Sequence, residues 1–156
     1  MRCVWRYETP IGKLGIAEKD CGISHILFEN QPAPPEYEMR ETPLTREAAA
    51  QLSAYFAGER KAFDLPILPE GTAFQRMVWD TLLTIKAGEI RTYQQVAAQI
   101  KRPAAVRAVG AANGRNPIPI IIPCHRVIGS DGSLTGYAGG LAAKQYLLEQ
   151  ERKHGG

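Results

Sequence analysis

The chain has 156 residues, of which 44% are hydrophobic and 22% are charged. A chain of this length and composition can bury a core and form one or two small globular domains. No apolar run approaches the roughly 18 residues that a membrane-spanning helix needs, and the N-terminus lacks the apolar core of a signal peptide. These features argue against a membrane-spanning or secreted protein, and we expect a cytoplasmic protein with no membrane partner.

Charge is distributed unevenly within the net value of +3. Residues 1–69 carry 8 basic and 10 acidic side chains, a balance of −2, whereas residues 70–156 carry 11 and 6, a balance of +5. Within residues 85–123, six basic side chains stand against a single acidic one, Glu89. Such a zone suits a phosphate backbone, and it equally suits a solvated surface with no partner.

The first third of the chain has the pattern of β-strands. Residues 3–20 alternate in character around a turn at residues 9–12, and residues 22–30 continue with another half-buried strand. The stretch over residues 31–43 is rich in Pro and Glu, which predicts a loop.

A helix is expected next, with Thr45 as its N-cap and with Leu52, Tyr55 and Phe56 on one apolar face. Gly58 is expected to end it. An extended stretch interrupted by prolines follows, and we place a domain boundary there. The first domain would then cover residues 1–69 as a small β-sheet domain with one helix.

The second domain, residues 70–156, is expected to be mainly helical. A helix with Thr72 as its N-cap is expected to end near Gly88, and a last amphipathic helix is expected over residues 141–153. The predicted fold class is therefore α/β, of the α+β kind. The second domain would be winged-helix-like and would contain a helix-turn-helix.

The helix-turn-helix is predicted from two short segments. Thr92 caps a helix over residues 93–100, and Pro103 suits the first turn of a second helix over residues 103–112. The second helix consists of Ala, Gly and Val around one long polar side chain, Arg107. Apart from Arg107, it lacks the polar side chains that recognise base edges in a major groove. Its small residues indicate either close approach to a narrow groove or tight helix packing.

The main chemical signal is a thiol beside an imidazole. Cys124 and His125 follow a proline and an apolar run, residues 118–122, that we expect to be a buried strand. A nearby imidazole can help to form a thiolate at neutral pH, directly or through a water, if a carboxylate fixes its other nitrogen. Glu149 and Glu151 are the candidates for that carboxylate. For an isolated Cys-His pair, a buried structural cysteine beside a hydrogen-bonded histidine is the commoner outcome.

The sequence context of this pair resembles a known family. The segment "IPCHRVIGSDGSLTGYAGGLAAKQYLLEQE" is similar, without a gap, to the active-site region of the O6-alkylguanine-DNA alkyltransferases, also called methylated-DNA–protein-cysteine methyltransferases. The segments "GEIRTYQQVAAQI", "AVRAVGAANGRNPIPIIIPCHRV" and "GTAFQRMVW" fit the same family. The resemblance is strong over residues 70–151. It is looser before them, through "TPIGKLGIA" and "YFAGERKAFDLPI".

The resemblance implies direct-reversal DNA repair. The protein would bind double-stranded DNA by the minor groove, flip the alkylated guanine out of the stack and transfer the alkyl group from O6 to its own cysteine. The transfer would be irreversible and would occur once per molecule. It would need no cofactor, and the protein would act as a monomer.

The resemblance also implies roles for individual residues. In catalysis these are Cys124 as acceptor, His125 as base through a water, Glu151 to orient His125, and Tyr93 as a donor to the flipped base. On DNA they are Arg107 in place of the flipped base, Tyr93 against the neighbouring phosphate, and the small residues Ala104, Ala105, Ala108 and Gly110 in the groove. Asn116 would be a hinge, and Val127, Tyr137 and Ala138 would line the guanine pocket with the backbone of Cys124.

Other interpretations remain at this stage. One is a lesion-binding module without chemistry. Relatives of the family of that kind lack the acceptor cysteine, whereas this chain has Cys124. A Cys-His hydrolase would need an oxyanion hole and an order of catalytic residues that the sequence does not show. The odd number of cysteines argues against a disulfide framework. We expect no metal, although Cys3, Cys21 and His25 are zinc-type ligands, because Cys21 and His25 miss the family's ligand positions when aligned on "TPIGKLG".

Overall fold

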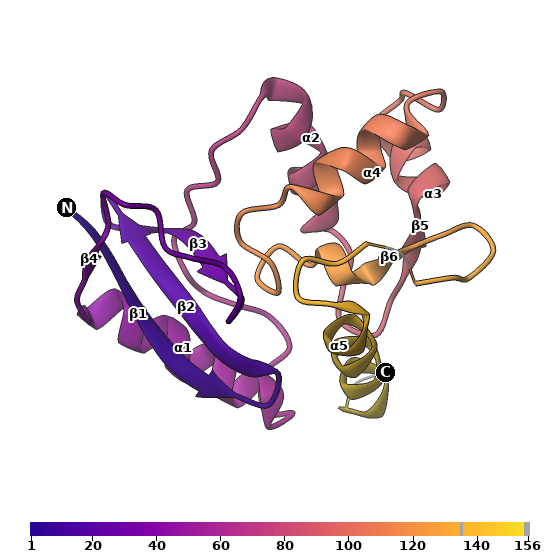
Figure 1. Ribbon diagram of the computed structural model, residues 1–156. Helices are drawn as coiled ribbons and strands as arrows, with labels where there is room; N and C mark the ends of the chain where they lie inside the picture. The colour runs from indigo at the N-terminus through magenta and orange to yellow at the C-terminus, as the bar shows by residue number, and fades with distance from the viewer. Residues whose placement is uncertain (135, 155–156) are drawn as a thin grey trace. The chain divides into compact units, whose positions relative to one another are not determined.

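The computed structural model describes residues 1–134 and 136–154. The chain forms two compact units (Figure 1). Unit 1 consists of Met1–Glu70 and Pro117–Pro119, and unit 2 consists of Gly71–Asn116 and Ile120–Gly156. Unit 1 contains a β-sheet with one helix and unit 2 is mainly helical, which confirms the predicted α+β class. Within the described residues no helix is long and apolar enough to cross a membrane.

Unit 1 contains a four-stranded sheet with the order β3-β2-β1-β4. The strands are β1 (Arg2–Thr9), β2 (Gly12–Lys19), β3 (Gly22–Leu27) and β4 (Glu38–Met39). The first three are antiparallel neighbours, as the alternation in the sequence predicts. The short strand β4 was not predicted, because two residues within a Pro-rich loop carry no periodic signal. It pairs in parallel with β1.

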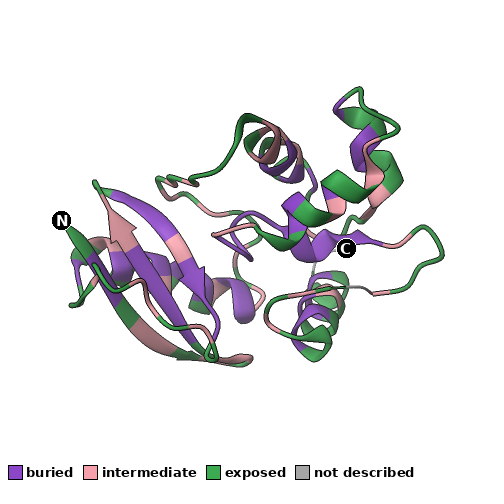
Figure 2. Ribbon diagram, turned by 45° about the horizontal axis from the view of Figure 1, so that its top comes forward, coloured by how far each residue is buried: buried purple, intermediate pink, exposed green. Residues whose placement is uncertain are grey.

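Both faces of this sheet are covered within unit 1. Val4, Ala17 and Leu27 form an apolar cluster on one face, against which Ala33 and Tyr37 of the following loop pack. The helix α1 (Pro43–Phe56) lies along the other face. Figure 2 shows buried residues along the central strands. The buried residues of α1 include Ala48, Leu52 and Tyr55.

The helix α1 starts earlier than predicted. Its N-cap is Thr42, not Thr45, and Pro43 occupies the first helical position. Proline suits that position because its fixed φ is helical and its missing N–H would have no partner there. Thr45 completes a capping box: the Thr45 N–H donates to Thr42 Oγ1 at 3.1 Å, and the Thr42 N–H donates to Thr45 Oγ1 at 3.0 Å. The predicted end of the helix is confirmed, since Gly58 follows it at φ +79°.

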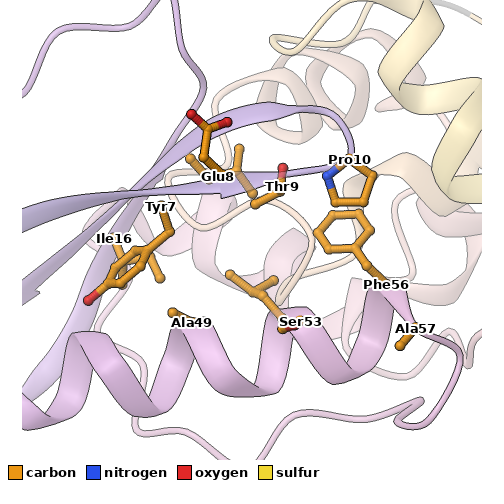
Figure 3. A pocket seen from close by; sticks show the side chains of 11 residues that line it. Tyr7, Glu8, Thr9, Pro10, Ile16, Ala49, Ser53, Phe56 and Ala57 are labelled. Carbon is orange, nitrogen blue, oxygen red and sulfur yellow. The ribbon is translucent and has the colours of Figure 1, made fainter.

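A pocket of about 280 Å³ lies between α1 and the sheet (Figure 3). Its lining includes the apolar side chains of Leu14 and Ile16 from β2 and of Leu52 from α1, together with Ser53 of the helix. Burial raises the pKa of Tyr7 in its wall to about 12, and the Tyr7 hydroxyl donates to Glu41 at 2.7 Å. None of the residues that the sequence marks for chemistry lines this pocket.

Unit 2 contains four α-helices, one turn of 3₁₀-helix and a pair of short parallel strands among its described residues. The α-helices and strands are α2 (Ala73–Leu82), β5 (Arg91–Thr92), α3 (Tyr93–Gln99), α4 (Val106–Gly114), β6 (Val127–Ile128) and α5 (Leu141–His154). The predicted caps Thr72 and Thr92 are confirmed, and each forms a capping box with the Gln three residues later. The helix α2 ends at Leu82, before the predicted end near Gly88, and Gly88 at φ +89° lies in the turn that follows.

The second helix of the predicted helix-turn-helix starts later than expected. The chain reverses at Lys101, which has φ +62°, so Pro103 falls in the connecting turn and α4 begins only at Val106. Ala104 therefore precedes the helix and Ala105 is its N-cap. The predicted pair of helices is otherwise present as α3 and α4.

The helix α2 is fixed to α4 by an aromatic side chain. Val78, Trp79 and Leu82 form the buried side of α2. The Trp79 indole N–H donates to the Ala112 carbonyl at 2.9 Å. A buried indole needs such a partner, since an unpaired N–H in the core is costly.

We expect Trp79→Phe to lower the free energy of unfolding by about 1 kcal/mol, because an aromatic ring remains while the buried hydrogen bond is lost. Urea unfolding followed by circular dichroism measures this. The control is Trp5→Phe: Trp5 is 38% exposed, and its replacement should change the unfolding free energy by less than about 0.5 kcal/mol. Equal effects of the two substitutions would contradict the role given to the Trp79 N–H.

Candidate active site

The thiol and the imidazole lie on one turn of 3₁₀-helix, Cys124–Arg126. The predicted strand over residues 118–122 is wrong, because this segment consists of turns and single bridge residues. Prolines on both sides of it cannot donate to a ladder, and buried Ile120 has φ +75°, a left-handed conformation that a β-branched residue rarely adopts. The chain therefore enters the site through a tight bend.

The side chain of His125 is bound to a buried ion pair. His125 Nε2 lies 2.7 Å from Glu151 Oε2, and Arg126 donates through Nε and Nη2 to the two oxygens of the same carboxylate at 2.9 and 2.8 Å. Arg126 also donates to the Ile85 carbonyl at 2.6 Å. His125, Arg126 and Glu151 are all buried. The structure thus brings Glu151 of α5 to His125, while Glu149 contacts Gln145 instead.

The protonation states follow from these contacts. Burial alone would raise the pKa of Glu151, but the hydrogen bonds from His125 and Arg126 outweigh it and hold that pKa well below its ordinary value. Burial lowers the pKa of His125, although Glu151 opposes the shift, so the ring is neutral at pH 7. Because the carboxylate only accepts, the ring proton is on Nε2 and Nδ1 is a free base. Among the described residues, Nδ1 has no hydrogen-bond partner.

The Cys124 thiol is protonated in this structure. Burial raises its pKa to about 11, against the opposing effects of a hydrogen bond from Asn116 and of the Lys144 charge. Asn116 also donates to the Ile122 carbonyl at 2.7 Å, so its amide spans the bend that leads to the nucleophile. Forming the thiolate at neutral pH therefore needs a base to accept the thiol proton. The nitrogen Nδ1 of His125, the next residue in the chain, has no hydrogen-bond partner among the described residues and is available for this.

Three residues of the site were not assigned a role from the sequence. Arg126 directly follows His125 in the sequence. Lys144 is fully buried, and its ammonium donates to the Val127 carbonyl at 2.7 Å. A sequence signal existed for it, because Lys144 lies seven residues before Glu151 and hence on the same side of α5. Asn113 is buried at the end of α4, and its amide Nδ2 donates to the Cys124 carbonyl at 3.3 Å.

The residues predicted to contact DNA lie on α3 and α4. Arg107 and Ala108 are exposed on α4, and Ala104 is exposed in the turn before it. Tyr93 is half-buried at the start of α3, and its ring is 3.9 Å from the point where a Cβ of Gly110 would lie. Ala105, the cap of α4, is half-buried.

The predicted pocket residues follow the 3₁₀ turn. Val127 is buried in β6, Tyr137 is half-buried in the loop before α5, and Ala138 is exposed there. Elsewhere, Cys3 is buried in β1 and Cys21 is exposed. Within residues 1–134 and 136–154 there is no group of three or more His, Cys, Asp or Glu that could hold a metal ion.

We expect Glu151→Gln to lower the free energy of unfolding by about 3 kcal/mol, because it leaves the Arg126 guanidinium buried without a counter-charge. Arg126→Met should also destabilise the fold. The loss of unfolding free energy in the double variant should be smaller than the sum of the two single losses, by more than about 1 kcal/mol. Urea unfolding at pH 7 measures all three. Glu149→Gln on the same helix is the control. Strict additivity would show that the ion pair is not energetically coupled.

The sequence matches two family models that together span most of the chain. Residues 6–69 match the 6-O-methylguanine DNA methyltransferase, ribonuclease-like domain, and residues 73–153 match the 6-O-methylguanine DNA methyltransferase, DNA binding domain. The first lies within unit 1 and the second contains every residue of the site described above.

Relatives and solved structures agree with these matches. The chain is 50% identical over 150 residues to a methylated-DNA–protein-cysteine methyltransferase of Methanosarcina barkeri, covering 94% of this chain and 95% of that protein. It is 47% identical to the constitutive one of Bacillus subtilis, covering 93% and 92%. It is also similar to the O6-methylguanine methyltransferase of Mycobacterium tuberculosis, with a TM-score of 0.92 and 43% identity over 100% of this chain and 96% of that one. The Mycobacterium tuberculosis protein in complex with DNA matches with a TM-score of 0.92 and 44% identity, over 97% and 93% of the chains. The chain therefore belongs to the 6-O-methylguanine DNA methyltransferase family.

Proposed function

We propose that this protein repairs alkylated DNA by transferring the alkyl group from O6 of guanine to the sulfur of its own Cys124, once per molecule. Membership of the family supports the reaction class. The observation that carries the assignment is the buried Cys124–His125–Glu151 arrangement: a thiol that needs a base is followed by an imidazole whose Nδ1 is free. No cofactor takes part.

The transfer is one displacement in which the atoms balance. The Cys124 thiol gives its proton to His125 Nδ1 through a water, and the sulfur attacks the saturated carbon on O6. The S–C bond forms as the C–O6 bond breaks, and the electron pair leaves with guanine. The Tyr93 hydroxyl donates to the leaving base as negative charge develops on it. The product is a thioether, which no thiol exchange reverses, so each protein acts once.

The DNA surface is formed by α3 and α4. The small exposed residues Ala104 and Ala108 allow close approach to the minor groove, and Arg107 fills the space left by the flipped guanine. Arg107 is exposed and is the only long side chain of this helix. The solved complex of a 44% identical relative with DNA supports a DNA partner. Ala105 and Gly110 complete the small-residue surface.

The flipped guanine occupies a pocket beside the 3₁₀ turn. Tyr137 forms a wall, and the backbone groups of Cys124, Val127 and Ala138 recognise the edge of the base. Asn116 acts as the hinge between α4 and the turn. We place these functions in residues 70–156 and give residues 1–69 a supporting role. The protein acts as a monomer in the cytoplasm.

Incubation with a duplex that carries O6-methylguanine should add one methylene mass, about 14 Da, to the intact protein and only to the Cys124 peptide. Mass spectrometry before and after digestion measures this. Cys124→Ser should gain nothing, and Cys21→Ser, which replaces an exposed thiol, should react fully. Tight lesion binding without a mass gain would show a non-catalytic binder. The absence of both lesion binding and a mass gain would refute the proposal.

The pH dependence of transfer tests the role of His125. A neutral base acting on a protonated thiol gives a rate that is flat between pH 7 and pH 9, because neither group changes state in that range when the pKa of His125 is lowered and that of Cys124 is raised to about 11. Without the base, the rate follows the thiolate fraction. His125→Ala should therefore react slowly at pH 7 and gain about tenfold per pH unit. Rapid-quench transfer at saturating duplex measures both. A wild-type rate that itself rises tenfold per unit would rule out His125 as the base.

A further inference from the structure

Asn113 joins the helix α4 to the residue that carries the thiol. It is a buried polar residue in the last turn of α4, only 3% exposed, while its neighbour Gly114 is exposed. Its side-chain Nδ2 donates to the Cys124 carbonyl at 3.3 Å. The contact links residues eleven positions apart, across the bend that contains Ile120.

The carbonyl that Asn113 holds belongs to the peptide between the nucleophile and the base. The same oxygen accepts from the Val127 N–H, which closes the 3₁₀ turn. The plane of the Cys124–His125 peptide sets where the thiol points relative to the imidazole that follows it. A hydrogen bond that fixes this plane therefore acts on the geometry of proton transfer without touching the reacting atoms.

The other half of the Asn113 amide indicates that folding stability does not explain the residue. Its Oδ1 is buried and has no hydrogen-bond partner among the described residues. An unsatisfied buried acceptor destabilises a fold, and an apolar side chain of the same shape avoids that loss. For packing alone, an apolar side chain of the same shape would stabilise the fold more than this asparagine. The asparagine is explained by its hydrogen bond to the Cys124 carbonyl.

We propose that Asn113 is a positioning residue for alkyl transfer, which fixes the Cys124–His125 peptide from the end of α4 and so couples that helix to the nucleophile. The inference rests on the proposed function. Arg107 stands on the same short helix, six residues before Asn113, and all of α4 lies within unit 2. A displacement of Arg107 on DNA binding would therefore be transmitted to the Cys124 peptide through one helix and one hydrogen bond.

The test is Asn113→Leu, which keeps the branched shape and removes both polar atoms. Single-turnover transfer from a duplex with O6-methylguanine gives the rate constant at saturation, and binding to unmodified duplex gives Kd. We expect the rate constant to fall about tenfold or more, Kd to stay within about twofold, and the melting temperature to stay equal or rise. Asn30→Leu, at an exposed position in unit 1, is the control and should match the wild type in all three.

Asn113→Ala separates positioning from packing. It also removes the hydrogen bond but leaves a cavity, so it should be less stable than N113L and transfer at a similarly reduced rate. If N113L transfers at the wild-type rate, or if slowing follows loss of stability across the two variants, Asn113 has no positioning role. If the wild type itself does not transfer, the proposed function fails instead, and the two failures are thus distinguished.

Discussion

The site depends on one buried carboxylate. Glu151 is bound by Arg126 through both oxygens and by His125 through one of them, and all three side chains are out of solvent. A buried carboxylate without such partners would take up a proton. Arg126 keeps it charged, the charge sets the proton of His125 on Nε2, and the base lone pair is thereby placed on Nδ1. The same three bonds attach α5 to the 3₁₀ turn, so the tautomer and the packing of the helix have a common cause.

The thiol shows the complementary arrangement. Burial raises the pKa of Cys124 more than the Asn116 hydrogen bond and the Lys144 charge lower it. In the proposed single transfer this balance protects the acceptor, because a protonated buried thiol is a poor target for other electrophiles. Under that proposal, the neutral imidazole of His125 is needed only when a substrate is in place. Permanent activation of the thiol by a charged neighbour would, in the proposed reaction, leave Cys124 open to other electrophiles before a lesion is bound.

The sequence predicted the elements whose signals are local. The alternation in β1 to β3 and the Thr-capped starts of α2 and α3 were read correctly, because capping and pleating involve residues a few positions apart. The start of α1 was misplaced by three residues, since Thr42 and Thr45 both fit a cap and only Pro43 distinguishes them. The three residues of the site without an assigned role, Asn113, Arg126 and Lys144, make contacts eleven to forty-one residues away along the chain. Periodicity carries no information on such pairs.

The sequence left two alternatives for the Ala-rich helix, tight packing and close approach to a groove, and the structure shows the packing. On the inner face of α4, within unit 2, the Ala112 carbonyl accepts from the Trp79 indole and the Asn113 amide donates to the Cys124 carbonyl. The outer face keeps Arg107 and further small residues in solvent. Small side chains let α2 and α3 pack closely against the inner face of this helix. On the outer face they leave the low surface that the proposed contact with a DNA groove requires. A larger residue on the inner face would displace the outer one, so in the proposed complex with DNA the packing of this helix and its fit to the groove would change together.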